Sequence, residues 1–212
     1  MVIVTDFGLD VQSYASDFSN LTFAKPRICP NCSASEKLVG HGSYPRQVCD
    51  HKQFFLILVK RLLCKICRRT VSLLPSFCLP HRHYHTSVIQ KVLSLRIQVT
   101  SSWNAVRESF LPYDLPRLST CREWTATFSR ASGPYISQLL KQLADWQLAP
   151  GKLELALADL CILPTAPKQL LAAVPHLVAW LRDSGLDLPV STWNWLGTLW
   201  QWGRGAKLDR LL

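Results

Sequence analysis

The sequence predicts an α+β protein in which a small β-rich ribbon with four cysteines comes first and an all-α region follows. Three observations predict this class. Two C-x-x-C pairs, Cys29–Cys32 and Cys64–Cys67, are separated by 31 residues. The segments between and just after these pairs are rich in aromatic and β-branched side chains, which favour strands. From about residue 86 onwards, apolar residues recur at helical spacing instead.

Length and composition indicate a folded chain. Its 212 residues allow one large or two modest domains, and 48% of them are hydrophobic. The first 20 residues lack the basic start of a signal peptide, and no uninterrupted apolar stretch is long enough for a transmembrane helix. Without an export signal, the eight cysteines favour a reducing cytoplasm and metal binding over disulfides.

The N-terminal part is expected to contain two segments. Residues 1–24 are expected to form a weakly structured arm, to which Val2–Val4 could add a short strand. Residues 25–80 are expected to form the ribbon, with glycines at the bends and Pro75 as the end of its last strand. The three strands expected in it are Lys37–Val48, Gln53–Leu63 and Arg68–Leu74.

The paired cysteines predict a closed metal site. A C-x-x-C pair places two thiolates on one tight turn, and two such turns together form a tetrahedral site that suits zinc. We therefore expect Cys29, Cys32, Cys64 and Cys67 to bind one structural zinc ion, which would stabilise a small fold. A redox pair is disfavoured because neither pair opens a thioredoxin-like helix, the context that lowers a thiol pKa.

A second metal site is left open by the sequence. Its candidate ligands are Cys49, His51, Cys78, His81, His83 and His85. Irregular spacing and the lack of a third C-x-x-C pair argue against this site. The histidines would then add conditional positive charge near the ribbon. Cys121 and Cys161 are interpreted as buried apolar residues.

Positive charge is concentrated on the ribbon. The formal net charge is +10, and residues 25–91 hold twelve Lys or Arg against two acids, whereas the two signs balance elsewhere. Such an excess points to a polyanion, most simply nucleic acid, although a solvated basic surface is the alternative. We expect phosphate contacts from Arg46, Lys60, Arg61, Lys65, Arg68, Arg69 and Arg82.

The helical part is expected to contain a domain at residues 81–148 and a tryptophan-rich region at residues 149–212. Helices are expected at Thr86–Val99, Trp103–Phe110, Thr120–Arg130, Tyr135–Trp146, Leu153–Leu163, Lys168–Arg182 and Trp193–Trp202. The fourth of these is expected to begin at Gly133-Pro134. The first three could form a helix-turn-helix, with Ser119 as the cap of the third. An ordinary all-α packing is the alternative.

The ribbon also resembles a known family. The residues concerned are Cys29-Pro30-x-Cys32, His41-Gly42-x-Tyr44 with a following Arg, Arg61-x-x-Cys64-x-x-Cys67-x-Arg69-Thr70, and then Ser72-Leu-Leu-Pro75, Pro80 and Tyr84. They resemble the zinc-binding head of certain bacterial insertion-sequence transposases, and more closely a group of short bacterial proteins that share this head. In the transposases, the head and a helix-turn-helix contact DNA. The resemblance implies DNA binding here, with Ser119, Thr120 and Arg122 facing the duplex.

The sequence after the ribbon offers little support for catalysis and contains a cluster of tryptophans near its C-terminal end. The acids after the ribbon do not follow convincing strands, and no phosphate-binding loop, H-E-x-x-H or G-x-S-x-G motif is present. We therefore do not expect an enzyme, although a degenerate transposase or nuclease is a further alternative. The four tryptophans of residues 193–202 predict core packing, or else a face for a homo-oligomer or protein partner.

Together these observations predict a cytoplasmic, nucleoid-associated, zinc-dependent DNA-binding protein. It would be a transposase-like recognition module without a catalytic domain, linked to a mobile element or to regulation. The alternative is a protein-interaction adaptor in a recombination or transposition complex. RNA remains open as a ligand because a basic ribbon does not itself distinguish a 2′-hydroxyl. No membrane partner is expected.

Overall fold

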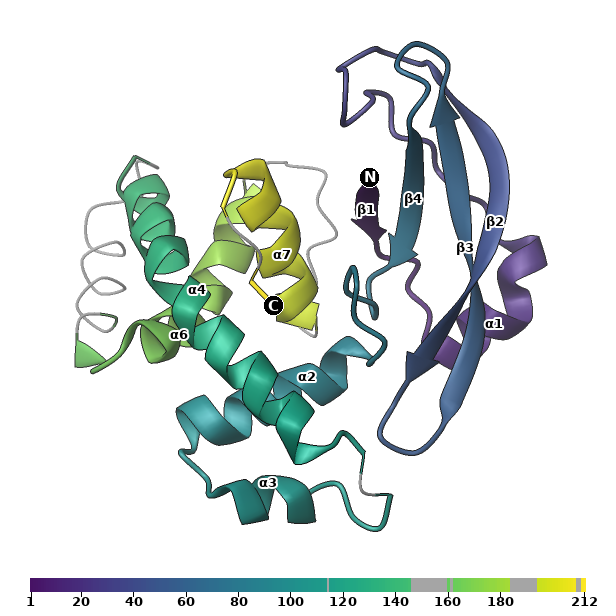
Figure 1. The fold of residues 1–212 in the computed structure, drawn as a ribbon. Helices are drawn as coiled ribbons and strands as arrows, with labels where there is room; N and C mark the ends of the chain where they lie inside the picture. Colours follow the sequence, from purple (N-terminus) through teal and green to yellow (C-terminus); the bar gives the residue numbers. More distant parts are fainter. Residues whose placement is uncertain (114, 146–159, 161, 184–193, 209–210) are drawn as a thin grey trace. The chain divides into compact units, whose positions relative to one another are not determined.

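The computed structural model describes residues 1–113, 115–145, 160, 162–183, 194–208 and 211–212. The chain divides into two compact units, Met1–Thr86 (unit 1) and Ser87–Leu212 (unit 2), and each is considered by itself. Unit 1 contains a β-sheet, and the regular elements described in unit 2 are helices (Figure 1). The predicted α+β class is therefore confirmed.

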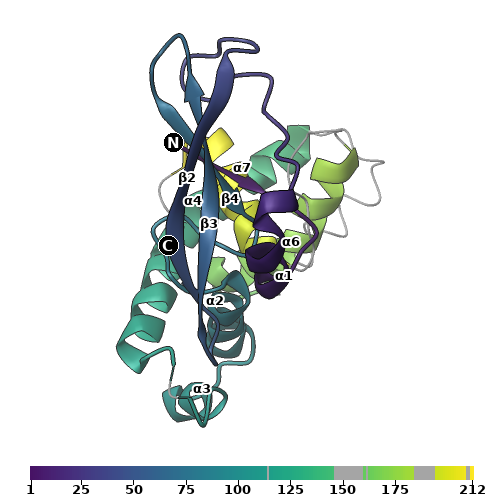
Figure 2. The ribbon, with the colours of Figure 1, turned by 90° about the vertical axis from the view of Figure 1, so that its right-hand side faces the viewer.

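Unit 1 is built on a four-stranded sheet with the order β1-β4-β3-β2. Its strands are β1 (Val2–Thr5), β2 (Leu38–Cys49), β3 (Phe54–Cys64) and β4 (Thr70–Pro75). β2 and β3 form a long, twisted antiparallel hairpin, which Figure 2 shows extending past the two shorter strands. The three predicted strands are confirmed as β2, β3 and β4.

The first 24 residues belong to the fold, and the prediction of a weakly structured arm is wrong for most of them. β1 pairs in parallel with β4. α1 (Val11–Asp17), followed by the short helix η1 (Phe18–Asn20), packs near β3. Tyr14 is fully buried, and its hydroxyl donates a hydrogen bond to the carbonyl of Leu58 at 3.0 Å. The local sequence did not reveal this structure, because residues 1–20 contact β3 and β4, which lie far along the chain.

The sheet separates two hydrophobic cores because successive side chains of a strand point to opposite faces. On one face, Ile57 and Val59 of β3 pack in a cluster with Tyr14 of α1. Leu62 and Cys64 of the same strand pack in the second cluster, which includes cysteines of both turns. Unit 1 therefore has a hydrophobic core of its own, and the cysteine turns are built onto one side of it.

Unit 2 contains the helices α2, α3, α4, α6 and α7, and the π-helical turn η2. Their bounds are α2 (Thr86–Leu93), η2 (Ser94–Gln98), α3 (Trp103–Glu108), α4 (Leu118–Asp145), α6 (Ala166–Asp183) and α7 (Trp195–Gly205). The helices predicted at residues 86–99, 103–110 and 168–182 are confirmed within a few residues. Most of the helix predicted at residues 153–163, together with Cys161 and Trp193, lies outside the described residues.

α4 is a single helix of 28 residues, so the predicted break at Gly133-Pro134 is wrong. Its buried residues continue on one stripe through the proline: Cys121, Trp124, Phe128, Ser132, Tyr135, Ile136 and Leu139. A proline inside a helix costs about 3 kcal/mol. Burial of each large apolar side chain contributes about 1.5–3 kcal/mol. The stripe on both sides of Pro134 therefore outweighs the missing backbone hydrogen bond.

Two of the tryptophans of α7, Trp195 and Trp202, pack within unit 2. Trp202 is only 5% exposed, and its Nε1 donates a hydrogen bond to Gln142 Oε1 at 2.7 Å. Its ring lies 5.8 Å from that of Tyr135, and the half-buried Trp195 makes an edge contact with Phe128 at 6.1 Å. Core packing is thus confirmed for Trp202.

None of the helices described combines the length and apolar character needed to span a membrane.

The packing of α7 on α4 predicts that Gly203→Ala will destabilise the protein. A Cβ at this position would lie 2.5 Å from Tyr135 Cζ, so either the buried Tyr135 ring or the helix backbone would have to shift. Such overpacking costs about 1–3 kcal/mol. The free energy of unfolding, measured with urea, should fall accordingly. Gly205→Ala on the same helix is the matched control, because its Cβ meets nothing within 4 Å. Equal effects of the two variants would contradict the prediction.

Candidate metal centre and adjacent basic surface

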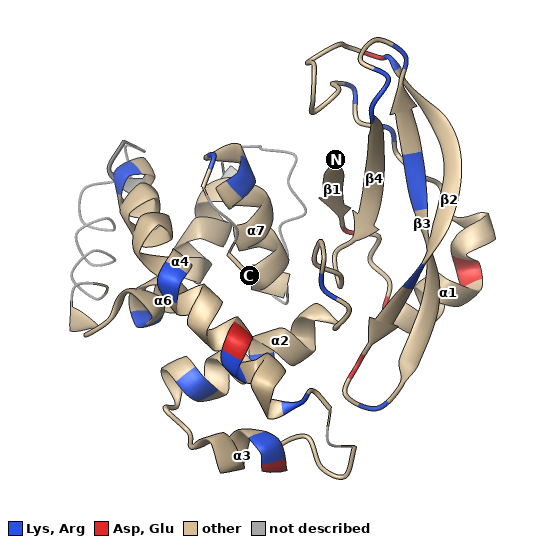
Figure 3. Ribbon diagram, in the orientation of Figure 1, with Lys and Arg blue, Asp and Glu red and all other residues tan. Residues whose placement is uncertain are grey.

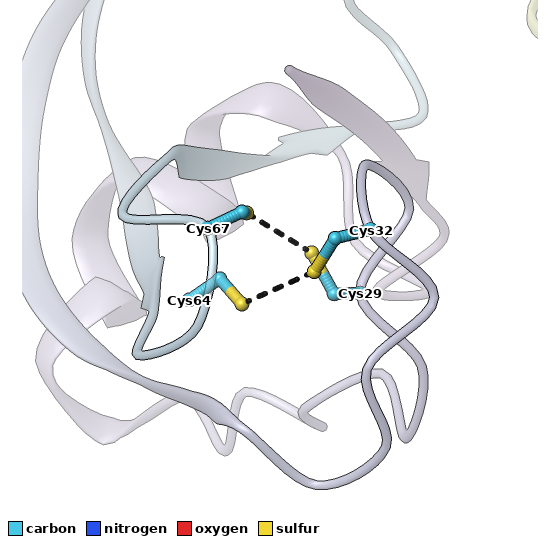
Figure 4. Close-up of side chains that lie close together, drawn as sticks. All are labelled: Cys29, Cys32, Cys64 and Cys67. Atoms are coloured by element: carbon cyan, nitrogen blue, oxygen red, sulfur yellow. Dashed lines mark hydrogen bonds between the residues drawn. The ribbon is translucent and has the colours of Figure 1, made fainter.

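Four cysteines converge at one end of the sheet. Cys29 and Cys32 come from the loop before β2, Cys64 ends β3, and Cys67 lies in the turn before β4. Their sulfur atoms all lie within 4.8 Å of one another. Figure 4 marks two of the sulfur pairs, Cys29–Cys67 at 3.8 Å and Cys32–Cys64 at 3.7 Å. The two sequence pairs therefore meet as predicted.

The two turns have the same backbone hydrogen bonds. In the first, the N–H of Ser33 donates to the carbonyl of Cys29 at 2.9 Å, and the N–H of Cys29 donates to Ala34. In the second, the N–H of Arg68 donates to the carbonyl of Cys64 at 3.0 Å, and the N–H of Cys64 donates to Arg69. Such repeated hydrogen bonds give the two turns the same local backbone arrangement.

The residue after each pair has a left-handed backbone. Ser33 has a φ of 58° and Arg68 a φ of 57°. This conformation costs a residue with a Cβ roughly 1–2 kcal/mol relative to glycine. Both turns adopt this unfavourable conformation at the same position. The surrounding hydrogen bonds and the positions of the sulfurs therefore determine the local backbone geometry.

Backbone amides hydrogen-bond to the sulfurs. The N–H of Asn31 lowers the pKa of Cys29, and the N–H of Arg69 lowers the pKa of Cys67 to about 6. For Cys32 the N–H of Ala34 also lowers the pKa, but burial and the neighbouring thiols raise it to about 11. The turns thus favour thiolates, while four sulfurs so close together resist carrying four charges at once.

A bound cation would resolve this conflict. Metal ions keep coordinating thiols deprotonated, and thiolates select soft or borderline metals such as zinc. A tetrahedral ion with Zn–S bonds of about 2.3 Å separates its sulfurs by about 3.8 Å. The Cys29–Cys67 and Cys32–Cys64 sulfur distances of 3.8 and 3.7 Å match this edge length. The four cysteines therefore fit a single tetrahedral metal ion.

The candidate ligands of a second site do not converge. Among the residues that the structure describes, the four-cysteine group alone brings ligand atoms together in this way. Burial raises the pKa of Cys49 to about 11 and that of Cys78 to about 12, so both are neutral thiols. His85 is stacked on Phe77 with ring centroids 5.6 Å apart, and burial lowers its pKa. Cys121 is buried, as predicted.

The predicted basic residues fall into two groups. Lys65, Arg68 and Arg69 are exposed on the second cysteine turn and the residues that follow it. Because the backbone of Arg68 and Arg69 makes the hydrogen bonds that shape this turn, their position depends on the cysteine cluster. Figure 3 shows further Lys and Arg on the segments around the same end of the sheet. We call the surface formed by Lys65, Arg68 and Arg69 the knuckle surface.

The remaining four predicted basic residues are half-buried. The Arg46 guanidinium donates hydrogen bonds to the carbonyls of Leu79 and Arg82, so its role in the fold is to hold this backbone segment. Lys60 Nζ lies 5.6 Å above the ring of Phe23, and the Arg61 guanidinium lies 5.8 Å from the ring of Tyr44. These stacked positions do not single them out as phosphate ligands.

Three exposed basic residues near the first turn were not selected from the sequence. They are Lys25, Arg27 and Lys37. The carbonyl of Lys37 accepts a hydrogen bond from the N–H of Lys65 at 2.9 Å, which joins the two cysteine-bearing segments. Their membership of the basic stretch was visible in the sequence, but their proximity to the second turn was not.

The residues expected to read DNA lie in the first turns of α4. The helix begins at Leu118, so Ser119 lies inside it and is not the predicted cap. Ser119 and Arg122 are exposed, and Thr120 is half-buried. The Arg122 guanidinium lies 5.6 Å from the ring centre of Trp103 in α3. These three residues belong to unit 2, whereas the cysteine cluster belongs to unit 1.

Comparison with known proteins yields one family. Residues 29–109 match the model of a family described as a domain of unknown function (DUF6431). The matched segment begins at the first cysteine of the cluster and ends just after α3, and it covers less than half of the chain. No curated protein and no solved structure matches the chain.

The left-handed backbone of the first turn predicts that Ser33→Gly will stabilise the protein. Glycine adopts this φ without the clash of a Cβ, and the expected gain is up to about 1 kcal/mol after its extra unfolded-state entropy. The midpoint of thermal unfolding in zinc-containing buffer should therefore rise.

The control is Ser35→Gly, two residues further on, where the backbone is not left-handed. This variant should lower the midpoint, because glycine there only adds freedom to the unfolded chain. A lower midpoint for both variants would show that Ser33 is not strained.

Proposed function

We propose that this chain is a zinc-dependent DNA-binding protein in which the cysteine cluster shapes a phosphate-binding surface. It serves as a transposase-like recognition module without a catalytic domain, in a mobile element or in regulation. The observation that supports this most is the overlap of the cluster with the knuckle surface. The backbone that surrounds the sulfurs is the same backbone that displays Lys65, Arg68 and Arg69.

Charge and geometry both link the cysteine cluster to phosphate binding. Four thiolates on a divalent ion leave a net charge of about −2, which nearby cations offset. Arginine guanidinium groups bind phosphate oxygens through paired N–H donors, and their spacing decides which phosphates they reach. A metal that fixes the turn therefore fixes that spacing. Exposed basic residues on both cysteine-bearing segments extend the surface.

Unit 2 contributes the second part of the proposal. α2, α3 and α4 are three successive helices, and the first turns of α4 expose Ser119 and Arg122. A helix-turn-helix places such residues in the major groove, where they meet base edges. The connection from α3 to α4 spans nine residues, 109–117, whereas a tight helix-turn-helix has three or four. We therefore propose a helix-turn-helix-like arrangement with an enlarged turn.

Zinc is the metal that we propose, and the first test is its stoichiometry. Purified protein should contain one zinc per chain by elemental analysis. Cys64→Ala should lose the zinc and lower the unfolding midpoint, because a tetrahedral structural site needs all four ligands. Cys78→Ala, also buried in unit 1, should keep the zinc because this thiol lies outside the cluster. Zinc retained by Cys64→Ala would contradict the proposal.

The second test is the salt dependence of DNA binding. Affinity for random-sequence duplex DNA, measured by fluorescence anisotropy, should fall steeply between low and physiological salt. Replacing Lys65, Arg68 and Arg69 by Ala should flatten the plot of log affinity against log salt by up to about 0.9 for each phosphate that is no longer neutralised. Replacement of the exposed Arg130, Lys141 and Lys207 is the control, with the same change in charge.

Equal slopes for the two triple variants would show that net charge, rather than the knuckle surface, determines binding. Affinity that does not change with salt would overturn DNA binding through phosphates altogether. A duplex RNA of the same length distinguishes the ligand, because A-form RNA presents its 2′-hydroxyls in a wide, shallow minor groove. Equal or tighter binding to the RNA would redirect the proposal to RNA.

A protein-interaction adaptor is the second candidate, and one observation favours it. Phe54, Leu56 and Leu58 of β3 are 57%, 72% and 40% exposed. They alternate along the strand, so they share one face of the sheet. Apolar side chains gathered on an exposed face are typical of interaction surfaces. A chain that binds a protein but shows no salt-dependent DNA affinity would favour this candidate.

A further inference from the structure

Two arginines stack on one tryptophan in unit 2. The Arg96 guanidinium carbon lies 4.3 Å from the ring centre of Trp103, and that of Arg122 lies 5.6 Å from the same ring centre. The three residues come from η2, α3 and α4 respectively. A single indole ring thus joins the start of α3 to the elements before and after it.

The two arginines have different surroundings. Arg96 is half-buried, and its guanidinium also donates to the carbonyl of Ser101, so it holds the turn between η2 and α3. Arg122 is exposed. Within the described part of the chain, the stacking on Trp103 is the interaction found for its guanidinium. Arg122 therefore lies over the ring of Trp103 while its side chain remains exposed to solvent.

Trp103 belongs to α3, which is held in place by buried side chains and hydrogen bonds. α3 has only six residues, too few to be stable alone. Val106 and Phe110 are buried, and the Ser102 hydroxyl accepts a hydrogen bond from the N–H of Ala105. Ser109 and Phe110 lie just past the end of α3, and Lys91 of α2 contacts both. Its Nζ lies 4.6 Å from the ring centre of Phe110 and donates a hydrogen bond to the carbonyl of Ser109 at 2.7 Å.

We propose that Trp103 is a positioning residue for DNA recognition, and this inference rests on the function proposed above. The indole ring holds the Arg122 side chain in a restricted set of rotamers at the start of α4. A stacked guanidinium keeps its N–H donors in its own plane, so they stay free to meet a phosphate or a guanine edge. DNA binding then loses less side-chain entropy, because part of the ordering exists already.

The experiment is a double-mutant cycle on the full-length, zinc-loaded protein with one duplex, selected from random sequence for tight binding. The variants are Trp103→Leu, Arg122→Ala and the pair. Arg122→Ala should weaken binding roughly tenfold, as removal of one bidentate contact does. Trp103→Leu should weaken it about two- to fivefold, the range expected for an exposed cation–π pair. In the Arg122→Ala background, Trp103→Leu should have almost no further effect.

Three readouts separate positioning from a general structural role. Trp103→Phe keeps an aromatic face and should recover most of the affinity that Trp103→Leu removes. Zinc content and the unfolding midpoint monitor the fold in every variant. Arg130→Ala on the same helix is the matched control for removal of one positive charge, because Arg130 is exposed and lies two turns further along α4.

The outcomes distinguish this inference from the proposed function. Additive losses in the cycle, or no recovery in Trp103→Phe, would overturn the positioning role while leaving DNA binding intact. A decrease in affinity for Arg122→Ala no larger than that for Arg130→Ala would do the same. Absence of duplex binding by the unaltered protein would overturn the proposed function, and this inference with it.

Discussion

The convergence of four cysteine sulfurs within 4.8 Å of one another is the constraint on which the metal-site end of unit 1 depends. Thiolates this close repel one another, so the arrangement calls for a cation at their centre. The backbone suits such a cation site, since both turns repeat the same hydrogen bonds and the same left-handed residue after the second cysteine. Those turns also pack on Leu62 and Val71 of the sheet, which links the metal site to a hydrophobic core.

The position of the cluster explains how a structural site could serve a binding function. Arg68 and Arg69 belong to the second turn by their backbone and to the surface by their side chains. A change at the sulfurs therefore changes the spacing of the charges. In unit 2, Trp103 plays a comparable part for Arg122, through stacking instead of coordination. In both units, the residue that we propose as a DNA contact is exposed and lies beside a neighbour that we propose orients it.

Local sequence patterns predicted some elements well and failed for others. The hairpin strands were recognisable because aromatic and β-branched residues are concentrated in residues 53–63. The cysteine ligands were recognisable because the C-x-x-C spacing is set by the geometry of one turn. The short strand allowed at Val2–Val4 is present as β1, but its pairing with β4 was missed because β4 lies about 70 residues away. The break at Pro134 was predicted wrongly because a local rule was applied to a helix whose buried stripe continues past it.

The sequence by itself determined the four candidate sulfur ligands, the concentration of positive charge and the three strands of residues 38–75, because each of these depends on near neighbours along the chain. Tertiary structure decided which basic residues are available. Arg46 and Arg69 are alike in the sequence, yet the half-buried Arg46 donates to the backbone carbonyls of Leu79 and Arg82, and Arg69 is exposed beside the cysteine cluster. Tertiary structure likewise stacked Arg122 on Trp103, since ring and guanidinium come from different helices. Such differences arise from contacts between distant residues, which no local pattern contains.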